Sequence, residues 1–161
     1  MTFSNNRSCR QYLTVLAALL LVALCAAPVG SETMPPGIQV ELNPEKPLRL
    51  RVTLRSGAET TATFFRSLLP WGNRYSMVFV AVKPHGQPID LELPVQDPTG
   101  DKVSLSPGAS LSGDIHLNWV IRDLDRVTKQ SDVHLFWAYE SPKELNISHW
   151  SGGWILIPQQ K

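Results

Sequence analysis

The stretch LRLRVTLR, residues 48–55, decides the fold class because apolar and polar residues alternate along it without a break. Leucine and valine occupy the even positions, and arginine or threonine occupies the odd ones. A period of two places all the apolar side chains on one face of an extended chain. The stretch therefore predicts a strand of an antiparallel sheet, with one face in a core and the other in water.

Further extended runs surround this stretch, separated by turns rich in proline, glycine and aspartate. The chain has 13 prolines and 10 glycines among its 161 residues, a composition that favours many turns over long helices. Residues 75–82 (YSMVFVAV) are apolar on both faces, so this strand is expected at the centre of a sheet. Residues 123–130 lack alternation and predict one helical turn. The predicted strands cover residues 38–42, 48–55, 60–68, 75–82, 89–93, 102–105, 111–121, 133–139 and 154–157.

This spacing of short strands and turn signals predicts an all-β fold. About seven to nine strands in one domain are typical of an antiparallel, immunoglobulin-like β-sandwich. The alternative is a small β-barrel. The cysteine pair of antibody domains is absent from the predicted strands, so the prediction concerns architecture and not family.

The N-terminal residues have the composition of a secretory signal peptide. Arg7 and Arg10 give a positively charged start, and residues 13–27 (LTVLAALLLVALCAA) are apolar apart from one threonine. This run is shorter than the roughly 20 residues that span a bilayer, and small residues follow it up to Ser31. We expect a signal peptide at residues 1–31, a flexible lead-in at 32–37 and the β-sandwich domain at 38–161.

The signal predicts export to the periplasm or the outside of the cell, with membrane contact only if the leader stays uncleaved. A lipid-modified Cys25 is a further alternative, which the large Leu24 before it disfavours. Cleavage after residue 31 removes both cysteines, Cys9 and Cys25, and changes the formal net charge from +1 to −1. A cysteine-free mature domain excludes thiol nucleophiles, thiolate metal sites and redox exchange. The absence of a basic block excludes nucleic-acid binding by charge.

The sequence offers no catalytic motif. It has no Gly-x-Ser-x-Gly elbow, and Ser148 beside His149 is not in itself a nucleophile–base pair. Asp114 and His116 share one face of a predicted strand, and together with His134 they could hold zinc or copper. No compact His-x-His spacing supports such a site. We therefore expect no enzymatic activity, no cofactor and no metal site, and keep a periplasmic metal-binding protein as a third function hypothesis.

The five tryptophans and a stripe of arginines give the candidates for partner binding. Trp119 and Trp137 are in phase with apolar strand faces, so both are expected in the core. Trp71 and Trp150 lie in predicted loops, and Trp154 follows a Gly-Gly pair at the start of the last predicted strand. A ring held by Pro or Gly in a loop is either a rigid anchor for a partner or a plug of the core. The arginines meet an anionic partner or form the wet face of an edge strand. The candidates are Leu69, Trp71, Trp150, Trp154, Arg49, Arg51 and Arg55.

Export, the lack of catalytic motifs and the apolar loops together favour a non-enzymatic binding module. The first hypothesis is a protein-binding, assembly or inhibitory module that uses its loops or an edge strand, with another exported or envelope protein as partner. The alternative is a carbohydrate-binding module with exposed aromatic platforms. Its candidate side chains are Trp150, Trp154 and Tyr139.

Overall fold

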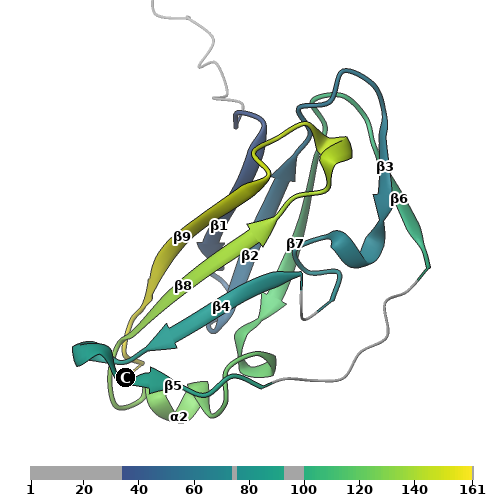
Figure 1. Cartoon of the computed structure of the whole chain (residues 1–161). Helices are drawn as coiled ribbons and strands as arrows, with labels where there is room; N and C mark the ends of the chain where they lie inside the picture. The colour runs from purple at the N-terminus through teal and green to yellow at the C-terminus, as the bar shows by residue number, and fades with distance from the viewer. Residues whose placement is uncertain (1–33, 74–75, 93–99, 161) are drawn as a thin grey trace, which may run out of the picture. The chain divides into compact units, whose positions relative to one another are not determined.

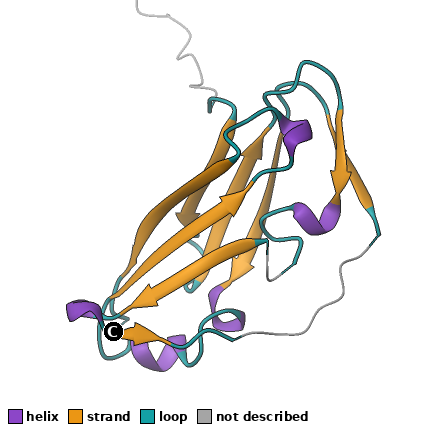
Figure 2. Ribbon diagram, in the orientation of Figure 1, coloured by secondary structure: helices purple, strands orange, loops and turns teal. Residues whose placement is uncertain are grey.

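The computed structural model describes residues 34–73, 76–92 and 100–160. Within these ranges the chain is an antiparallel β-sandwich, which confirms the predicted all-β fold (Figures 1 and 2). In chain order the strands are β1 (Gly37–Leu42), β2 (Arg49–Arg55), β3 (Ala62–Phe65), β4 (Met77–Val82), β5 (Pro88–Ile89), β6 (Lys102–Leu105), β7 (Ser110–His116), β8 (Val133–Glu140) and β9 (Trp150–Ile157).

Two sheets form the layers of the sandwich. One has the strand order β1-β2-β7 and the other has the order β5-β4-β8-β9. In Figure 1 the second sheet lies in front of the first, and the β3-β6 ribbon stands to one side of both. One hydrophobic core joins residues of both sheets and of the ribbon, because each sheet turns the apolar half of its alternating strands inward.

The stretch that predicts the fold class forms the middle strand of its sheet. Leu50, Val52 and Leu54 on β2 are fully buried, while the side chains between them are only half-buried. β2 pairs with β1 on one side and with β7 on the other. The predicted alternation is confirmed, and the arginine stripe therefore lies on a central strand and not on an edge.

Several predicted strands differ in length from the observed ones. β3 ends at Phe65, where a 3-10 turn, η1 (Arg66–Leu68), begins. β7 ends at His116, which is paired with Arg49, the first residue of β2. Leu48 before it has a left-handed φ of 57°, and its carbonyl accepts one more bond, from Leu117 N at 3.0 Å. The chain then continues as the 3-10 turn η3 (Leu117–Trp119). β5 has only two residues, and residue 93 of the predicted strand lies outside the described residues.

The remaining connections are short helical turns. The turn expected at 123–130 is confirmed as α2 (Leu124–Thr128). Two further 3-10 turns are η2 (Pro84–Gly86) and η4 (Lys143–Leu145). None of the helices in the described ranges is long and apolar enough to cross a bilayer.

β4 is apolar on both faces, but only one of these faces is buried, whereas the sequence suggested that both would be. β4 lies between β5 and β8, as a central strand should. Its inner residues Met77, Phe79 and Ala81 are buried, but Val78 is 57% exposed and Val80 is 52% exposed. The second apolar face is therefore open to solvent and not packed in the core.

Candidate functional site

The solvent side of the β5-β4-β8-β9 sheet carries large apolar side chains from three neighbouring strands. Pairing across the sheet aligns Val80 with Phe136 and Phe136 with Trp154, so one apolar row crosses β4, β8 and β9. Alternation along each strand adds further members on the same side. We call the following set the outer face: Val78 (57% exposed), Val80 (52%), Phe136 (45%), Trp150 (55%), Trp154 (62%) and Leu156 (41%).

The outer face is large for a surface that stays open to water. With 150–250 Å² for an aromatic side chain and somewhat less for an aliphatic one, its uncovered parts total on the order of 600 Å². That is the upper end of the largest apolar patch on a monomeric protein. Single exposed apolar residues need no explanation, but a contiguous patch of this size makes the outer face a candidate interaction surface.

Small residues separate the two tryptophans of the outer face. Ala138 on β8 pairs with Gly152 on β9, between the row of Trp154 and the position of Trp150. The ring of His134 lies 6.1 Å from that of Trp154, at the other end of the face. The surface is therefore uneven, with bulky aromatic rings on either side of a low centre.

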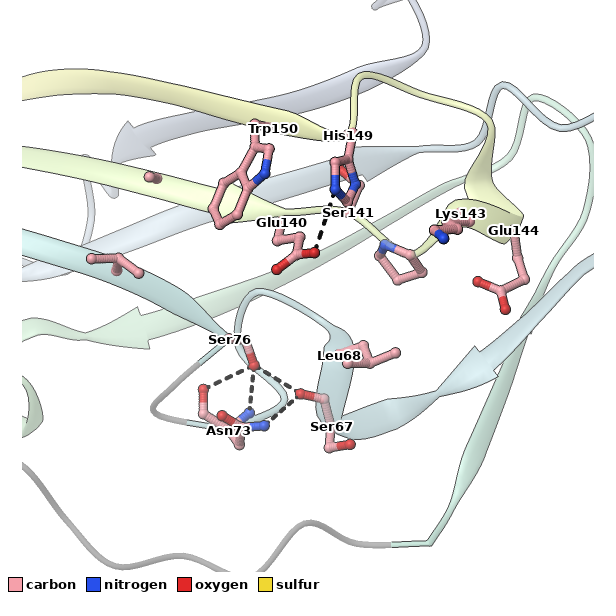
Figure 3. Close-up of a pocket in the computed structure, with 13 residues that line it drawn as sticks. Ser67, Leu68, Asn73, Ser76, Glu140, Ser141, Lys143, Glu144, His149 and Trp150 are labelled. Atoms are coloured by element: carbon pink, nitrogen blue, oxygen red, sulfur yellow. Dashed lines mark hydrogen bonds and ion pairs between the residues drawn. The ribbon is translucent and has the colours of Figure 1, made fainter.

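A groove of about 450 Å³ borders the outer face at Trp150 (Figure 3). Hydrogen bonds to one main-chain oxygen join two of the segments that line it. The Ser67 carbonyl accepts from Asn73 Nδ2 at 2.6 Å and from Ser76 Oγ at 2.8 Å. The lining residues are Ser67, Leu68, Asn73, Ser76, Val78, Ala138, Glu140, Ser141, Pro142, Lys143, Glu144, His149 and Trp150.

The polar groups in and beside the groove include an exposed ion pair and three serines whose hydroxyls are hydrogen-bonded to the main chain. His149 Nε2 lies 3.5 Å from Glu140 Oε1, and both side chains are more than half exposed, so the pair adds little stability. The hydroxyls of Ser76, Ser141 and Ser148 all donate to main-chain carbonyls. A serine nucleophile donates its hydroxyl hydrogen bond to a base. These three described serines instead donate to main-chain carbonyls, which holds the local structure together.

The apolar connection at residues 68–73 folds inward. Leu69 is 2% exposed, and Trp71 packs against the core. The indole of Trp71 covers Gly113 of β7 so closely that a Cβ on this glycine would collide with ring atoms Cδ2 and Cε2. The sequence allowed this connection to be either an exposed anchor for a partner or a plug of the core. In the structure it is a plug, so neither residue offers an exposed anchor. A glycine inside an alternating strand is the sequence signal for such a close approach.

The expectation that Trp119 lies in the core is wrong. Trp119 is 55% exposed, and its ring stacks on His116 with centroids 4.1 Å apart and planes 7° apart. The 3-10 turn η3 breaks the alternation of β7, which moves this residue out of phase with the strand. Desolvation lowers the pKa of His116, and the nearby charges of Arg49 and Lys46 lower it further. Trp137 is half-buried and packs against the core as expected.

The predicted loop that holds Trp150 is a strand. β9 begins at Trp150, four residues earlier than expected, and the Gly-Gly pair lies within it. Gly153 is opposite Trp137, whose ring atom Cζ2 would lie 3.1 Å from a Cβ at this position. Gly153 therefore makes room for a neighbouring ring, and the Gly-Gly pair continues the strand and does not form a turn. Both Trp150 and Trp154 consequently lie on the outer face.

The arginine stripe makes contacts within the chain. Arg51 Nε lies 3.6 Å from Asp114 Oδ1 across the β2–β7 pair, and Lys46 Nζ lies 3.7 Å from the other oxygen of the same carboxylate. Arg55 Nη1 donates to the Met34 carbonyl at 2.5 Å. Arg49 is half-buried beside His116, its partner in the β2–β7 register.

The structure does not bring together the histidines of the metal hypothesis. His116 lies on β7 of one sheet and His134 on β8 of the other. In residues 34–73, 76–92 and 100–160, no three His, Cys, Asp or Glu side chains are grouped as metal ligands would be.

Tyr139 is not available as a platform for a sugar. It is 1% exposed on the inner side of β8, and its hydroxyl donates to the Leu68 carbonyl at 2.8 Å. Burial raises the pKa of this phenol above its ordinary value of about 10. The aromatic set proposed for carbohydrate binding is therefore reduced to Trp150 and Trp154.

Tyr139→Phe is expected to lower the free energy of unfolding by about 1–2 kcal/mol at neutral pH, because the Leu68 carbonyl loses its donor. The raised pKa means that the neutral phenol stabilises the fold below pH 10 and that this contribution is lost as the pH rises further. Urea unfolding between pH 8 and about 11 should show a steeper alkaline loss in the parent protein than in the variant. Equal slopes would contradict the assignment.

Comparison of the chain with protein families finds no matching family model, and comparison with curated proteins finds no significant sequence match.

Proposed function

We propose that this protein is an exported, non-enzymatic binding module whose outer face docks onto another exported or envelope protein. One observation carries the proposal: six large apolar side chains, each between 41% and 62% exposed, share one side of one sheet. The predicted signal peptide supports export, and it places the partner in the same compartment.

The chemistry of the outer face favours a protein over a sugar as its ligand. Val78, Val80 and Leu156 are aliphatic and cannot hydrogen-bond a hydroxyl. Polar side chains stand at its ends, where His134 precedes the apolar row and Glu140 follows it on β8. An apolar centre rich in aromatic rings with a polar rim is the usual anatomy of a protein–protein interface.

Val80→Lys is expected to weaken partner binding at least tenfold, because an ammonium group in the middle of a desolvated interface has no counter-charge. The side chain is 52% exposed, so the melting temperature should change little. The measurement is quantitative capture from a cell-envelope extract, comparing the parent protein, the variant and a matched control. Ser104→Lys is that control, since it adds the same charge at an exposed position on the β3-β6 ribbon.

A specific partner is one that the parent and Ser104→Lys proteins retain and that Val80→Lys loses. Equal capture by all three proteins would place the binding surface elsewhere and overturn the proposal. Loss of the partner from both lysine variants would show an effect of charge alone, which also contradicts docking on the outer face.

A glycan in the groove is the second candidate function. The observation in its favour is that the 55% exposed indole of Trp150 stands beside Glu140, Asn73 and Ser76, which supply hydrogen-bonding groups. A glycan array gives the test: Trp150→Ala should remove any hits, and Val80→Lys should keep them. An array without hits for the parent protein would dispose of this candidate.

A further inference from the structure

β9 is an edge strand whose own sequence lacks the usual protection against pairing with another chain. It is the last strand in the order β5-β4-β8-β9 and has eight residues, WSGGWILI, without a charge or a proline. Exposed edges are normally kept short or interrupted by charges, prolines or bulges. The opposite edge of this sheet, β5, has two residues and begins with Pro88, and the edge strand β1 carries the exposed Glu41.

The register shows which main-chain groups of β9 face outward. Ser141 N donates to the His149 carbonyl at 2.8 Å, and the two residues are opposite each other in the extended β8–β9 register. Hydrogen-bonded and non-hydrogen-bonded pairs alternate along an antiparallel ladder, so the odd-numbered residues of β9 bond to β8. The even-numbered residues direct their N–H and C=O groups away from it. In the described part of the chain, the one bond on that side is Ser148 Oγ to the Trp150 carbonyl.

The free edge is complementary to itself. An antiparallel pairing about a two-fold axis at Gly153 sets Trp150 opposite Leu156 of the second copy and Gly152 opposite Trp154 of the second copy. All four of these positions direct their main chain outward, so the pairing forms about eight main-chain hydrogen bonds. Each bulky Trp154 ring then has a glycine for its neighbour across the interface.

A slip of two residues in either direction is worse. A slip in one direction sets Trp154 opposite Trp154 of the second copy. It also sets Trp150 opposite Pro158 of the second copy, which has no N–H to donate. The other sets Trp150 against Trp154 and leaves Leu156 opposite Ser148, outside the strand. The sequence of β9 therefore specifies one register.

We infer that β9 pairs with β9 of a second copy of this chain, so that two β5-β4-β8-β9 sheets become one continuous sheet. The exposed parts of the two tryptophans on β9 offer on the order of 300 Å² per copy. Edge pairing covers only the part of this area that faces the second copy, beside the main-chain hydrogen bonds. The inference does not rest on the proposed function, although it would join two outer faces on one side of the dimer.

Cysteine cross-linking tests the register directly. The inferred pairing makes Ser151 and Ile155 of the second copy a non-hydrogen-bonded pair, whose Cα atoms lie about 4.5 Å apart, within the range of a disulfide. The protein is expressed from its full-length sequence with Cys9→Ser and Cys25→Ser in every variant. Ser151→Cys together with Ile155→Cys should give a disulfide-linked dimer on mild oxidation.

The two single cysteine variants are the matched controls. Alone, neither should cross-link, because each cysteine lies about four residues, roughly 13 Å, from its own copy in this register. An equal mixture of the two single variants should give a cross-linked heterodimer. Cross-linking of the singles, or none in the double variant or the mixture, would overturn the inferred pairing.

A second comparison isolates the main chain. Leu156→Pro removes an outward-facing N–H, whereas Leu156→Ala shortens the same side chain and keeps the donor. In sedimentation equilibrium the parent and Leu156→Ala proteins should have the mass of a dimer, and Leu156→Pro should dissociate at least tenfold more readily. A monomeric parent protein, or equal dissociation of both variants, would contradict edge pairing. Val80→Lys should leave the cross-link intact, so failure of the dimer and failure of partner docking are distinguishable.

Discussion

Trp71→Ala is expected to lower the free energy of unfolding by about 3 kcal/mol, a large share of the stability of a single domain. The indole packs against the core over Gly113 on β7. Its removal leaves a cavity that the rigid strand beneath cannot fill by moving. Urea or thermal unfolding followed by circular dichroism measures the loss. The loss lies in the lower part of the range for large aromatic deletions because Trp71 is half-buried and not fully buried.

Trp154→Ala is the matched control for this prediction. It deletes the same side chain at a position that is 62% exposed, so the free energy of unfolding should change by only about 0.5 kcal/mol. Similar losses in the two variants would show that Trp154 is covered or that Trp71 is not a plug. The first result would also remove the basis of the outer face.

Gly113→Ala is expected to cost about 3 kcal/mol or more, although it adds a single methyl group. A Cβ at this position would collide with Cδ2 and Cε2 of Trp71, and Gly113 is paired with Val52 in the middle of the sheet. Neither side can yield without strain in the core. Equilibrium unfolding and the yield of folded protein both report the loss.

The double variant isolates the contact between Gly113 and Trp71. In a Trp71→Ala background, Gly113→Ala should cost about 1 kcal/mol or less, because the ring that obstructs the methyl group is gone. Gly100→Ala serves as the control for alanine substitution, since nothing lies within 4 Å of its Cβ position. If the two single losses simply add in the double variant, the collision is not their cause.

The strands themselves could be predicted because their signal is local. The alternation of residues 48–55 requires only that one face of the strand be buried, and the structure buries Leu50, Val52 and Leu54. The prediction was wrong about where β7 ends, at His116, since the pairing of this strand depends on the distant strand β2. It also placed Trp150 in a loop, because a Gly-Gly pair in sequence is typical of a turn.

The candidate site depended on information that no local pattern contains. An apolar residue that faces away from the core has the same letter as one that faces into it, so Val80 and Phe79 were indistinguishable until the partner strands were known. For the same reason the sequence did not show which tryptophans are buried and which are exposed. Trp71 in a connection became a plug, and Trp119 in a strand-like run became exposed.

By itself the sequence determined that this protein is built of short strands, because a period of two is a property of the extended chain. It favoured a sandwich and left a small barrel as the alternative, between which the structure decided. It also supported the expectation of an exported domain without cysteine. Only the tertiary structure decided which apolar faces are covered, which glycines contact a tryptophan ring and which strands lie at the edges of the sheets. Burial is a relation between segments far apart in the chain, and the β5-β4-β8-β9 sheet has no second layer over its outer face among the described residues.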